Sequence, residues 1–154
     1  MACSMLVSGT GVAIPRSDIM PSKKTVKRAR QDLRKGKKPS TAAGEFVKEE
    51  FDHIRQGKHG ARSAKQAIAI GLSKARRAGV PLKPPKRGTV PESTRKSAAR
   101  AYEVGQRSPH APSPRRSRAS LRTLRREGKA AGTHRAIANQ VRASARKYRR
   151  RTAT

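Results

Sequence analysis

An excess of positive charge constrains this chain more than any other feature of its sequence. Among 154 residues, 39 are Lys or Arg and nine are Asp or Glu, so the formal net charge is +30. Charges of one sign repel each other in a compact fold, and they attract polyanions at long range. Only 33% of the residues are hydrophobic, well below the roughly 45–50% of ordinary globular chains. We therefore expect a small folded core with long basic segments attached to it.

Three helices are predicted where the large apolar residues gather, over residues 22–35, 41–56 and 63–78. Their candidate N-caps are Ser22, then Ser40 or Thr41, then Ser63, and a glycine follows each helix. Gln66 lies three residues after Ser63, which is the spacing of a capping box. Apolar side chains at helical spacing predict the core. The predicted core residues are Phe46, Val47, Phe51, Ile54, Ile68 and Leu72.

The rest of the chain shows no strand pattern and alternates linkers with basic helical stretches. Residues 1–19 are expected to be a disordered extension, either a floppy tail or a segment upstream of a natural start at Met20. After the third helix we expect a Pro-rich linker at 81–92, a short helix at 93–105, a disordered Ser/Pro linker at 106–116 and a basic helical tail at 117–154. The predicted fold class is all-α, with a small three-helix module over residues 20–80 and basic, partly disordered helical C-terminal arms.

The acidic and histidine residues give little support for catalysis. His53 lies among acidic residues and His59 in a Gly-rich turn, and the single cysteine, Cys3, adds no partner at a metal-binding spacing. All four histidines are expected to be exposed to solvent. An acidic outer face is expected on the second helix, formed by Glu45, Glu49, Glu50 and Asp52. The sequence therefore predicts a protein that is not an enzyme, with no catalytic residue, no cofactor and no metal site.

The basic segments carry the functional signal, because thirty excess positive charges predict binding to nucleic acid through phosphate contacts. Proteins that bind single strands or RNA commonly stack bases on aromatic side chains. With Phe46 and Phe51 assigned to the core, only Tyr102 and Tyr148 remain for stacking, which favours backbone contacts to duplex DNA. The candidate DNA-binding residues are Lys23, Lys24, Lys27, Arg28, Arg30, Arg62, Lys65, Lys74, Arg76, Arg77, Arg115, Arg116, Arg118, Arg146, Lys147, Arg149, Arg150 and Arg151.

Two short motifs bear on the mode of DNA binding. A helix-turn-helix over the second and third helices would place Arg62, Lys65 and Gln66 at the start of a recognition helix, although the turn at 57–62 is longer than the usual three or four residues. The sequence Ser113-Pro-Arg-Arg116 resembles the Ser-Pro-basic motifs of linker-histone tails, which lie along the minor groove. A linker broken by proline is the alternative interpretation of the same four residues.

Residues 21–82 resemble a family of small, basic bacterial proteins of unknown function. The resemblance lies in Pro39-Ser-Thr41, in Gly57-Lys-His-Gly-Ala-Arg62 and in the stretch from Lys65 to Arg77. Members are variously labelled DNA-binding or plasmid-stabilisation proteins. The resemblance implies a bacterial origin and a start near Met20, and it assigns no catalytic residue.

The function expected from the sequence is non-enzymatic and largely sequence-independent DNA binding by a nucleoid- or plasmid-associated protein. One alternative is an RNA- or ribosome-associated basic protein, and another is an adaptor that docks its acidic helix, residues 45–52, on a basic partner. No apolar run approaches the roughly 20 residues of a membrane span, so no membrane partner is expected. The expected location is therefore the cytoplasm, at the nucleoid. The sequence leaves the oligomeric state open.

Overall fold

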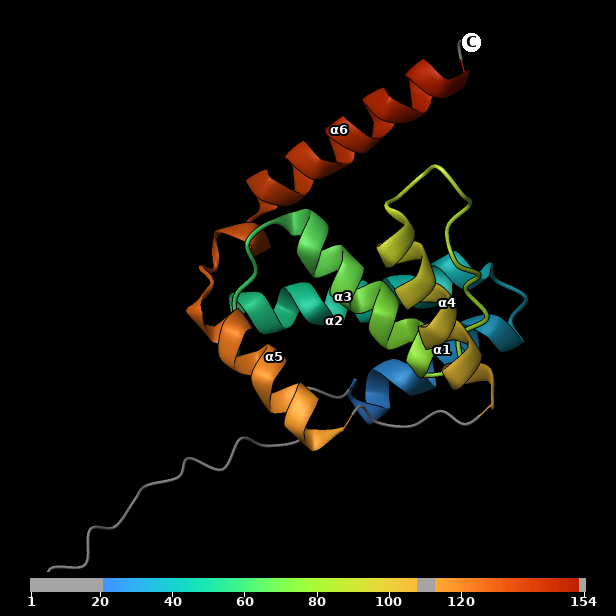
Figure 1. The fold of residues 1–154 in the computed structure, drawn as a ribbon, viewed down its shortest axis with the longest axis horizontal. Coiled ribbons are helices and arrows are strands. Elements are labelled where there is room, and N and C mark those ends of the chain that lie inside the picture. The colour runs from blue at the N-terminus through green and yellow to red at the C-terminus, as the bar shows by residue number, and fades with distance from the viewer. Residues whose placement is uncertain (1–20, 108–112, 153–154) are drawn as a thin grey trace, which may run out of the picture.

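The computed structural model describes residues 21–107 and 113–152, which form six α-helices and one short 3₁₀ helix (Figure 1). These elements are α1 (Lys23–Arg34), α2 (Pro39–Arg55), α3 (Ala64–Arg77), α4 (Glu92–Arg107), α5 (Pro114–Arg126), η2 (Ala130–Gly132) and α6 (His134–Thr152). The described ranges contain no strand, so the all-α prediction is confirmed. The extension predicted over residues 1–19 lies outside the described residues.

The first and third helices begin at the predicted caps. Ser22 Oγ accepts a hydrogen bond from Thr25 N at 3.2 Å, and Ser63 Oγ accepts one from Gln66 N at the same distance. The Gln66 side chain also accepts a hydrogen bond from the backbone of the residue before Ser63, at 2.9 Å. Each contact satisfies a backbone donor that the helix itself leaves unpaired. The glycine after each of the first three helices has a φ of 73° to 89°, where other residues are strained.

The boundaries of α2 and α4 differ from the prediction. The second helix begins at Pro39, and its N-cap Lys38 makes no side-chain capping hydrogen bond, so neither Ser40 nor Thr41 is the cap. Proline suits this first helical position because its φ is already helical and its missing N–H would have no partner there. The helix predicted at 93–105 extends from Glu92 to Arg107 and runs through Gly105. Gly105 lies inside the helix and does not end it. At this position α4 lies so close to the backbone of α3 that a Cβ would not fit.

The core lies around α2, which contacts α1, α3 and η2. Phe46 and Ile54 have no exposed surface and Phe51 is buried, as predicted. The other three predicted core residues, Val47, Ile68 and Leu72, are only partly buried at the edges of this core. Much of the remaining buried surface belongs to alanines, including Ala29, Ala42, Ala43, Ala67 and Ala75. Small side chains allow helices to approach closely, and Gly71 marks the crossing of α2 and α3, where a Cβ would lie 2.7 Å from Val47 Cα.

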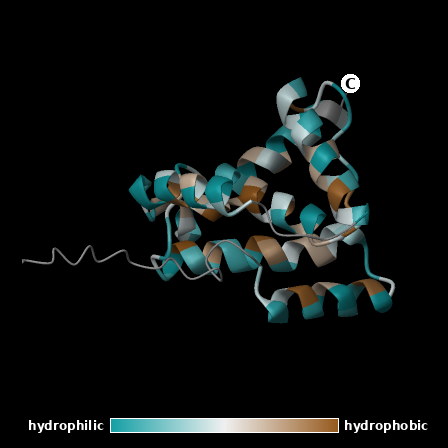
Figure 2. Cartoon of the chain, turned by 60° about the horizontal axis from the view of Figure 1, so that its bottom comes forward, coloured by the Kyte–Doolittle hydropathy of each residue, from teal (hydrophilic) through white to brown (hydrophobic). Residues whose placement is uncertain are grey.

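The chain beyond α4 returns to pack against the turn between α2 and α3. The backbone N–H groups of Gly60 and Ala61 donate to the carbonyls of Leu124 and Gly128, at 2.9 and 3.1 Å. The Arg55 side chain donates to a carbonyl of η2 at 3.1 Å. We name α1 to α5 together with η2 the body of the protein. Figure 2 shows hydrophobic residues interspersed with hydrophilic ones along the helices, as expected for a small core.

The last helix, α6, leaves the body and projects from it (Figure 1). Its first turns pack against the core through Ala136 and Ile137. From residue 141 to residue 150 every side chain is exposed, including Val141 at 60% and Tyr148 at 70%. We name residues 141–150 of α6 the arm. The arm is therefore a helix whose sides all face solvent.

Candidate functional site

The candidate cations of α1 lie on the surface. The five residues Lys23, Lys24, Lys27, Arg28 and Arg30 are all exposed. The helix packs through Thr25 and Ala29, which are buried and lie on another face. Arg28 Nη1 is 3.9 Å from Glu45 Oε2 of α2, so one of the five charges has an acidic neighbour. α1 thus presents a basic face to solvent.

The candidate cations of α3 divide into exposed and engaged residues. Arg62 and Lys65 are exposed near the N-terminus of the helix. Lys74 Nζ donates to Glu50 Oε2 at 2.6 Å, and both side chains are largely buried. Arg76 is buried, and its Nε donates to a backbone carbonyl of the segment after α3 at 3.2 Å. Lys74 and Arg76 therefore stabilise the fold and are not free to contact phosphate.

The cations at 115, 116 and 118 lie on one helix, α5 (Pro114–Arg126), although the sequence predicted a linker at 115 and 116. Arg115, Arg116 and Arg118 are exposed on α5, which begins three residues before the predicted Ser117. Ser113 is the N-cap, and its Oγ accepts a hydrogen bond from Arg116 N at 3.4 Å. Pro114 occupies the first helical position, where its fixed φ favours the helix. The motif Ser113 to Arg116 is therefore a helix start, and the linker predicted over these residues is wrong.

The arm carries a dense set of cations and no acidic residue. Its Lys and Arg side chains are Arg142, Arg146, Lys147, Arg149 and Arg150, all of them exposed. Arg151 follows within the same helix. Arg142 was absent from the candidates drawn from the sequence, and its exposure on this helix adds it to them.

The face of α2 that was predicted to be acidic and exposed is in fact partly buried. Glu50 has no exposed surface, and Glu49 and His53 are buried beside it. These residues follow Phe46 by three, four and seven positions, so they share its buried face. His59, in the turn after α2, is buried as well, so the expectation of exposed carboxylates at 49 and 50 and of exposed histidines at 53 and 59 is wrong. The other two histidines are His134, which is exposed, and His110, which lies outside the described residues.

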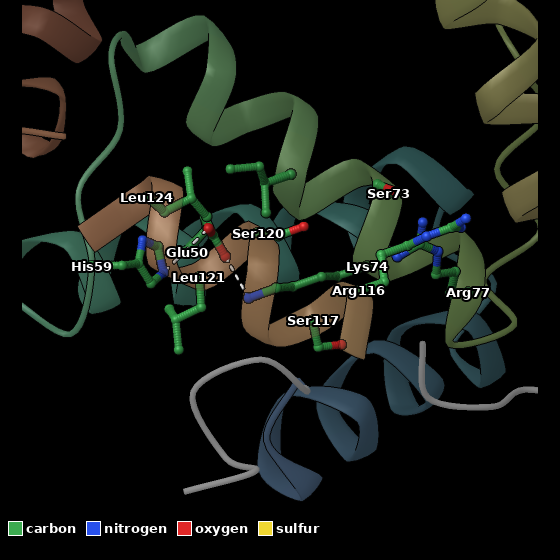
Figure 3. Close-up of a pocket in the computed structure, with 11 residues that line it drawn as sticks. Glu50, His59, Ser73, Lys74, Arg77, Arg116, Ser117, Ser120, Leu121 and Leu124 are labelled. Atoms are coloured by element: carbon green, nitrogen blue, oxygen red, sulfur yellow. Dashed lines mark hydrogen bonds and ion pairs between the residues drawn. The ribbon is translucent and has the colours of Figure 1, made fainter. Parts of the chain in front are cut away.

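Glu50 lies at the centre of this buried cluster. Figure 3 shows its carboxylate between the ammonium group of Lys74 and the imidazole ring of His59. One carboxylate oxygen, Oε2, accepts the hydrogen bond from Lys74. The other, Oε1, lies 3.4 Å from His59 Nε2 and accepts no hydrogen bond from the described residues. A buried carboxylate is costly unless its charge is compensated, and here Lys74 compensates it.

The position of His59 depends on the C-terminal part of the body. Its Nδ1 lies 3.1 Å from the carbonyl oxygen of Gly60, which can only accept, so Nδ1 carries the proton of that bond. The backbone of residues 127 and 128 passes close above Gly60, and a Cβ there would lie 2.6 Å from Gly128 O. Only glycine fits this approach. The end of α5 therefore fixes the turn that carries His59.

Glu49 and His53 form the other side of the cluster. Glu49 Oε1 accepts a hydrogen bond from Ser22 N at 2.7 Å, and it lies 4.0 Å from His53 Nε2. The second nitrogen of His53, Nδ1, is buried without a hydrogen-bond partner among the described residues. Burial and, to a lesser degree, nearby lysines lower the pKa of His53, although the two glutamates oppose this shift. His53 is therefore held in its neutral form at neutral pH.

A cavity of about 220 Å³ connects this cluster with the surface of α5. Glu50 and His59 lie at one end of it, and Arg77 and Arg116 lie at the other (Figure 3). Burial and the charge of Arg116 lower the pKa of Arg77, because two neighbouring cations disfavour each other. Leucine and isoleucine side chains and three serine hydroxyls complete the lining. The cavity is therefore apolar along its walls and cationic at its outer end.

Comparisons with known proteins give no relative for this chain: no family model, no curated protein and no solved structure matches it. Among the described helices, none combines the length and the apolar composition needed to cross a membrane.

Proposed function

We propose that this protein is a non-enzymatic DNA-binding protein that contacts phosphates through exposed Lys and Arg side chains, with little preference for sequence. One observation carries the proposal. The arm presents Arg142, Arg146, Lys147, Arg149 and Arg150 on a solvent-exposed helix that contains no acidic residue. The cations of such a helix repel each other in isolation. The phosphates of a polyanion would neutralise them, and the release of the polyanion's counterions would favour binding.

The aromatic residues support backbone contacts over the stacking of bases. Phe46 and Phe51 are buried and Tyr102 is partly buried, so Tyr148 is the one strongly exposed aromatic side chain in the described ranges. Readers of single strands commonly use several aromatic side chains as stacking platforms. A duplex bound along its phosphates needs none.

Sequence-specific binding through a helix-turn-helix has less support. The start of α3 would have to enter the major groove. Residues from η2 and from the first turns of α6 lie beside this end of α3 and share a cavity with Arg62, Ser63 and Ala64. Arg62 and Lys65 are therefore proposed as phosphate contacts, together with the exposed cations of α1 and α5.

The adaptor alternative loses much of the surface that it requires. Two of the four acidic side chains on α2, Glu49 and Glu50, are buried. The other two have basic neighbours, with Glu45 at 3.9 Å from Arg28 and Asp52 at 3.3 Å from Arg55. Self-neutralisation against the protein's own cations accounts for these acids. Association with the nucleoid or with plasmids is part of the same proposal.

The salt dependence of binding tests the proposal. Fluorescence anisotropy with a labelled duplex should give a log K that falls against log salt with a slope near −7, if about eight phosphates are neutralised. A slope shallower than about −2 would show that phosphate contacts are not the main source of affinity.

Competition at fixed salt separates DNA from RNA. Unlabelled duplex DNA of arbitrary sequence should displace the probe at least as well as a structured RNA of equal length. Displacement by RNA at a much lower concentration than DNA would favour the RNA-associated alternative. Both competitors must be freed of bound metal and protein before the experiment.

A further inference from the structure

Glu50, His53 and His59 bring three potential metal ligands together inside the body. One ligand atom from each of the three lies within 4.8 Å of the other two, and all three side chains are buried. Glu50 and His53 are contributed by α2, and His59 by the turn after it. We propose that these residues bind a divalent transition-metal ion of the Zn²⁺ class.

The contact between Glu50 and His59 gives the strongest reason. His59 Nδ1 is engaged by the carbonyl of Gly60, which leaves Nε2 as the ring nitrogen available to a metal ion. That nitrogen lies 3.4 Å from Glu50 Oε1, a buried carboxylate oxygen that accepts no hydrogen bond from the described residues. A cation between these two atoms would give both of them a partner. A histidine whose second nitrogen is held by a carbonyl is also the usual arrangement of a metal ligand.

The charges of the cluster point to the same missing cation. Of the two buried carboxylates, Glu50 pairs with the largely buried ammonium group of Lys74, and Glu49 lies 4.0 Å from the imidazole of His53. Three buried atoms take part in no hydrogen bond among the described residues: Glu50 Oε1, Glu49 Oε2 and His53 Nδ1. Buried polar atoms are almost always paired. A divalent ion bound by Glu50, His53 and His59 would balance the remaining negative charge and give Glu50 Oε1 a partner.

The donor set identifies the class of metal. Two imidazoles and one carboxylate suit Zn²⁺ and similar ions, whereas Ca²⁺ and Mg²⁺ require mainly oxygen ligands. Tetrahedral ligands about 2.1 Å from zinc lie roughly 3.4 Å from each other. Glu50 and His59 already have this separation. The His53 side chain must rotate by a small amount to close the site.

Three protein ligands leave one tetrahedral position for another group. Glu50 and His59 both line the 220 Å³ cavity that extends toward Arg77 and Arg116. A water molecule or a small anion can reach the ion from this side. Lys74 would remain on Glu50 Oε2 and orient the carboxylate, in the way that outer residues orient metal ligands.

The test uses the full chain with Cys3 replaced by serine, so that the lone thiol cannot bind metal. The protein is purified without a histidine tag, treated with nuclease and stripped with a chelator, and Zn²⁺ is then titrated against a chromophoric competitor. We expect one tight site per chain. Imidazole proton NMR provides the second measurement, because the chain has only four histidines. Zn²⁺ should shift the resonances of His53 and His59 and leave those of His110 and His134 in place.

His53→Gln is the main variant, because it removes a ligand without removing the partner of Lys74, and exposed His134→Gln is its matched control. We expect His53→Gln to weaken Zn²⁺ binding by about tenfold or more and the control to leave it unchanged. Circular dichroism establishes that both variants fold. If His53→Gln does not fold, the NMR measurement on the unsubstituted histidines decides alone.

Three results would overturn the proposal: no tight site, a site that shifts His110 or His134, or equal affinity in His53→Gln and the parent. The specific rival hypothesis is that a proton, and not a metal ion, lies between Glu50 and His59. In that case ¹⁵N NMR would show both nitrogens of His59 protonated near neutral pH, with no uptake of Zn²⁺.

Discussion

Two helices of similar length, α2 and the projecting α6, have opposite environments. α2 has 17 residues and is covered by α1, α3 and η2, whereas α6 has 19 residues and is exposed on all sides along the arm. α2 holds four of the nine acidic residues of the chain, and α6 holds none. The acids of α2 thus lie where cations from other elements surround them, and Glu50 compensates the charge of Lys74 there.

The two helices also differ in what keeps them helical. Tertiary packing stabilises α2 through Phe46 and Ile54 and through the ion pair of Glu50 with Lys74. The arm is exposed along its whole length, and isolated helices of this length are marginal in water. Its cations repel each other in addition. We therefore expect the body to be stable alone and the arm to gain stability from DNA.

Hydrogen exchange should show the largest difference between the two regions. Amides of α2 between residues 46 and 54 should exchange only through global unfolding, with an opening free energy of about 5 kcal/mol or more. Amides of the arm should open with a free energy near zero and become protected when duplex DNA is added. Equal protection of both segments in the free protein would contradict this picture, and it would also refute the partial disorder predicted for the C-terminal arms.

Removing one aromatic ring from each region should give the next largest contrast. Phe46→Ala should lower the free energy of unfolding by about 3–5 kcal/mol, because the ring is fully buried. That loss approaches the whole stability of a small domain, so helicity should collapse. Tyr148→Ala on the arm should change stability by less than about 0.5 kcal/mol. Urea unfolding followed by circular dichroism measures both, and a comparable loss in the two variants would mean that the arm is packed.

Removing one lysine from each region separates a structural charge from a surface charge. Lys74→Met should cost about 3 kcal/mol, because Glu50 would be left buried without its ammonium partner. Lys147→Met should have almost no effect on stability, and it should weaken DNA binding slightly. Stability of Lys74→Met equal to that of the parent would show that Glu50 is protonated or hydrated. Chemical denaturation of both variants in one buffer makes the comparison.

The sequence was sufficient to predict the first three helices, but not the buried cluster around Glu50. Serine caps and glycine stops depend on neighbouring residues, which is why Ser22 and Ser63 were identified correctly. The cluster was missed because hydrophobic periodicity counts charged residues as solvent-facing. A signal was present, since Glu49, Glu50 and His53 share the helical face of Phe46.

Other features depend on contacts between residues far apart in the chain. Lys74 neutralises Glu50 across 24 residues, and the turn that carries His59 is held by backbone carbonyls at Leu124 and Gly128. Single-sequence patterns do not encode which distant segments meet. For the same reason, the packing of α5 against the turn between α2 and α3 could not be predicted from its basic composition.

The most direct test of the central claim compares two sets of charge removals in DNA binding. One variant replaces Arg142, Arg146, Lys147 and Arg149 of the arm with glutamine. The control replaces four exposed cations elsewhere, Lys86, Arg87, Lys96 and Arg100, so both variants lose four charges from the net +30. If the arm contacts phosphate, the slope of log K against log salt should become less negative by about 3.6 in the arm variant. In the control it should become less negative by less than about 1. Equal losses in the two variants would show that net charge alone governs binding, and the account of the arm would be wrong.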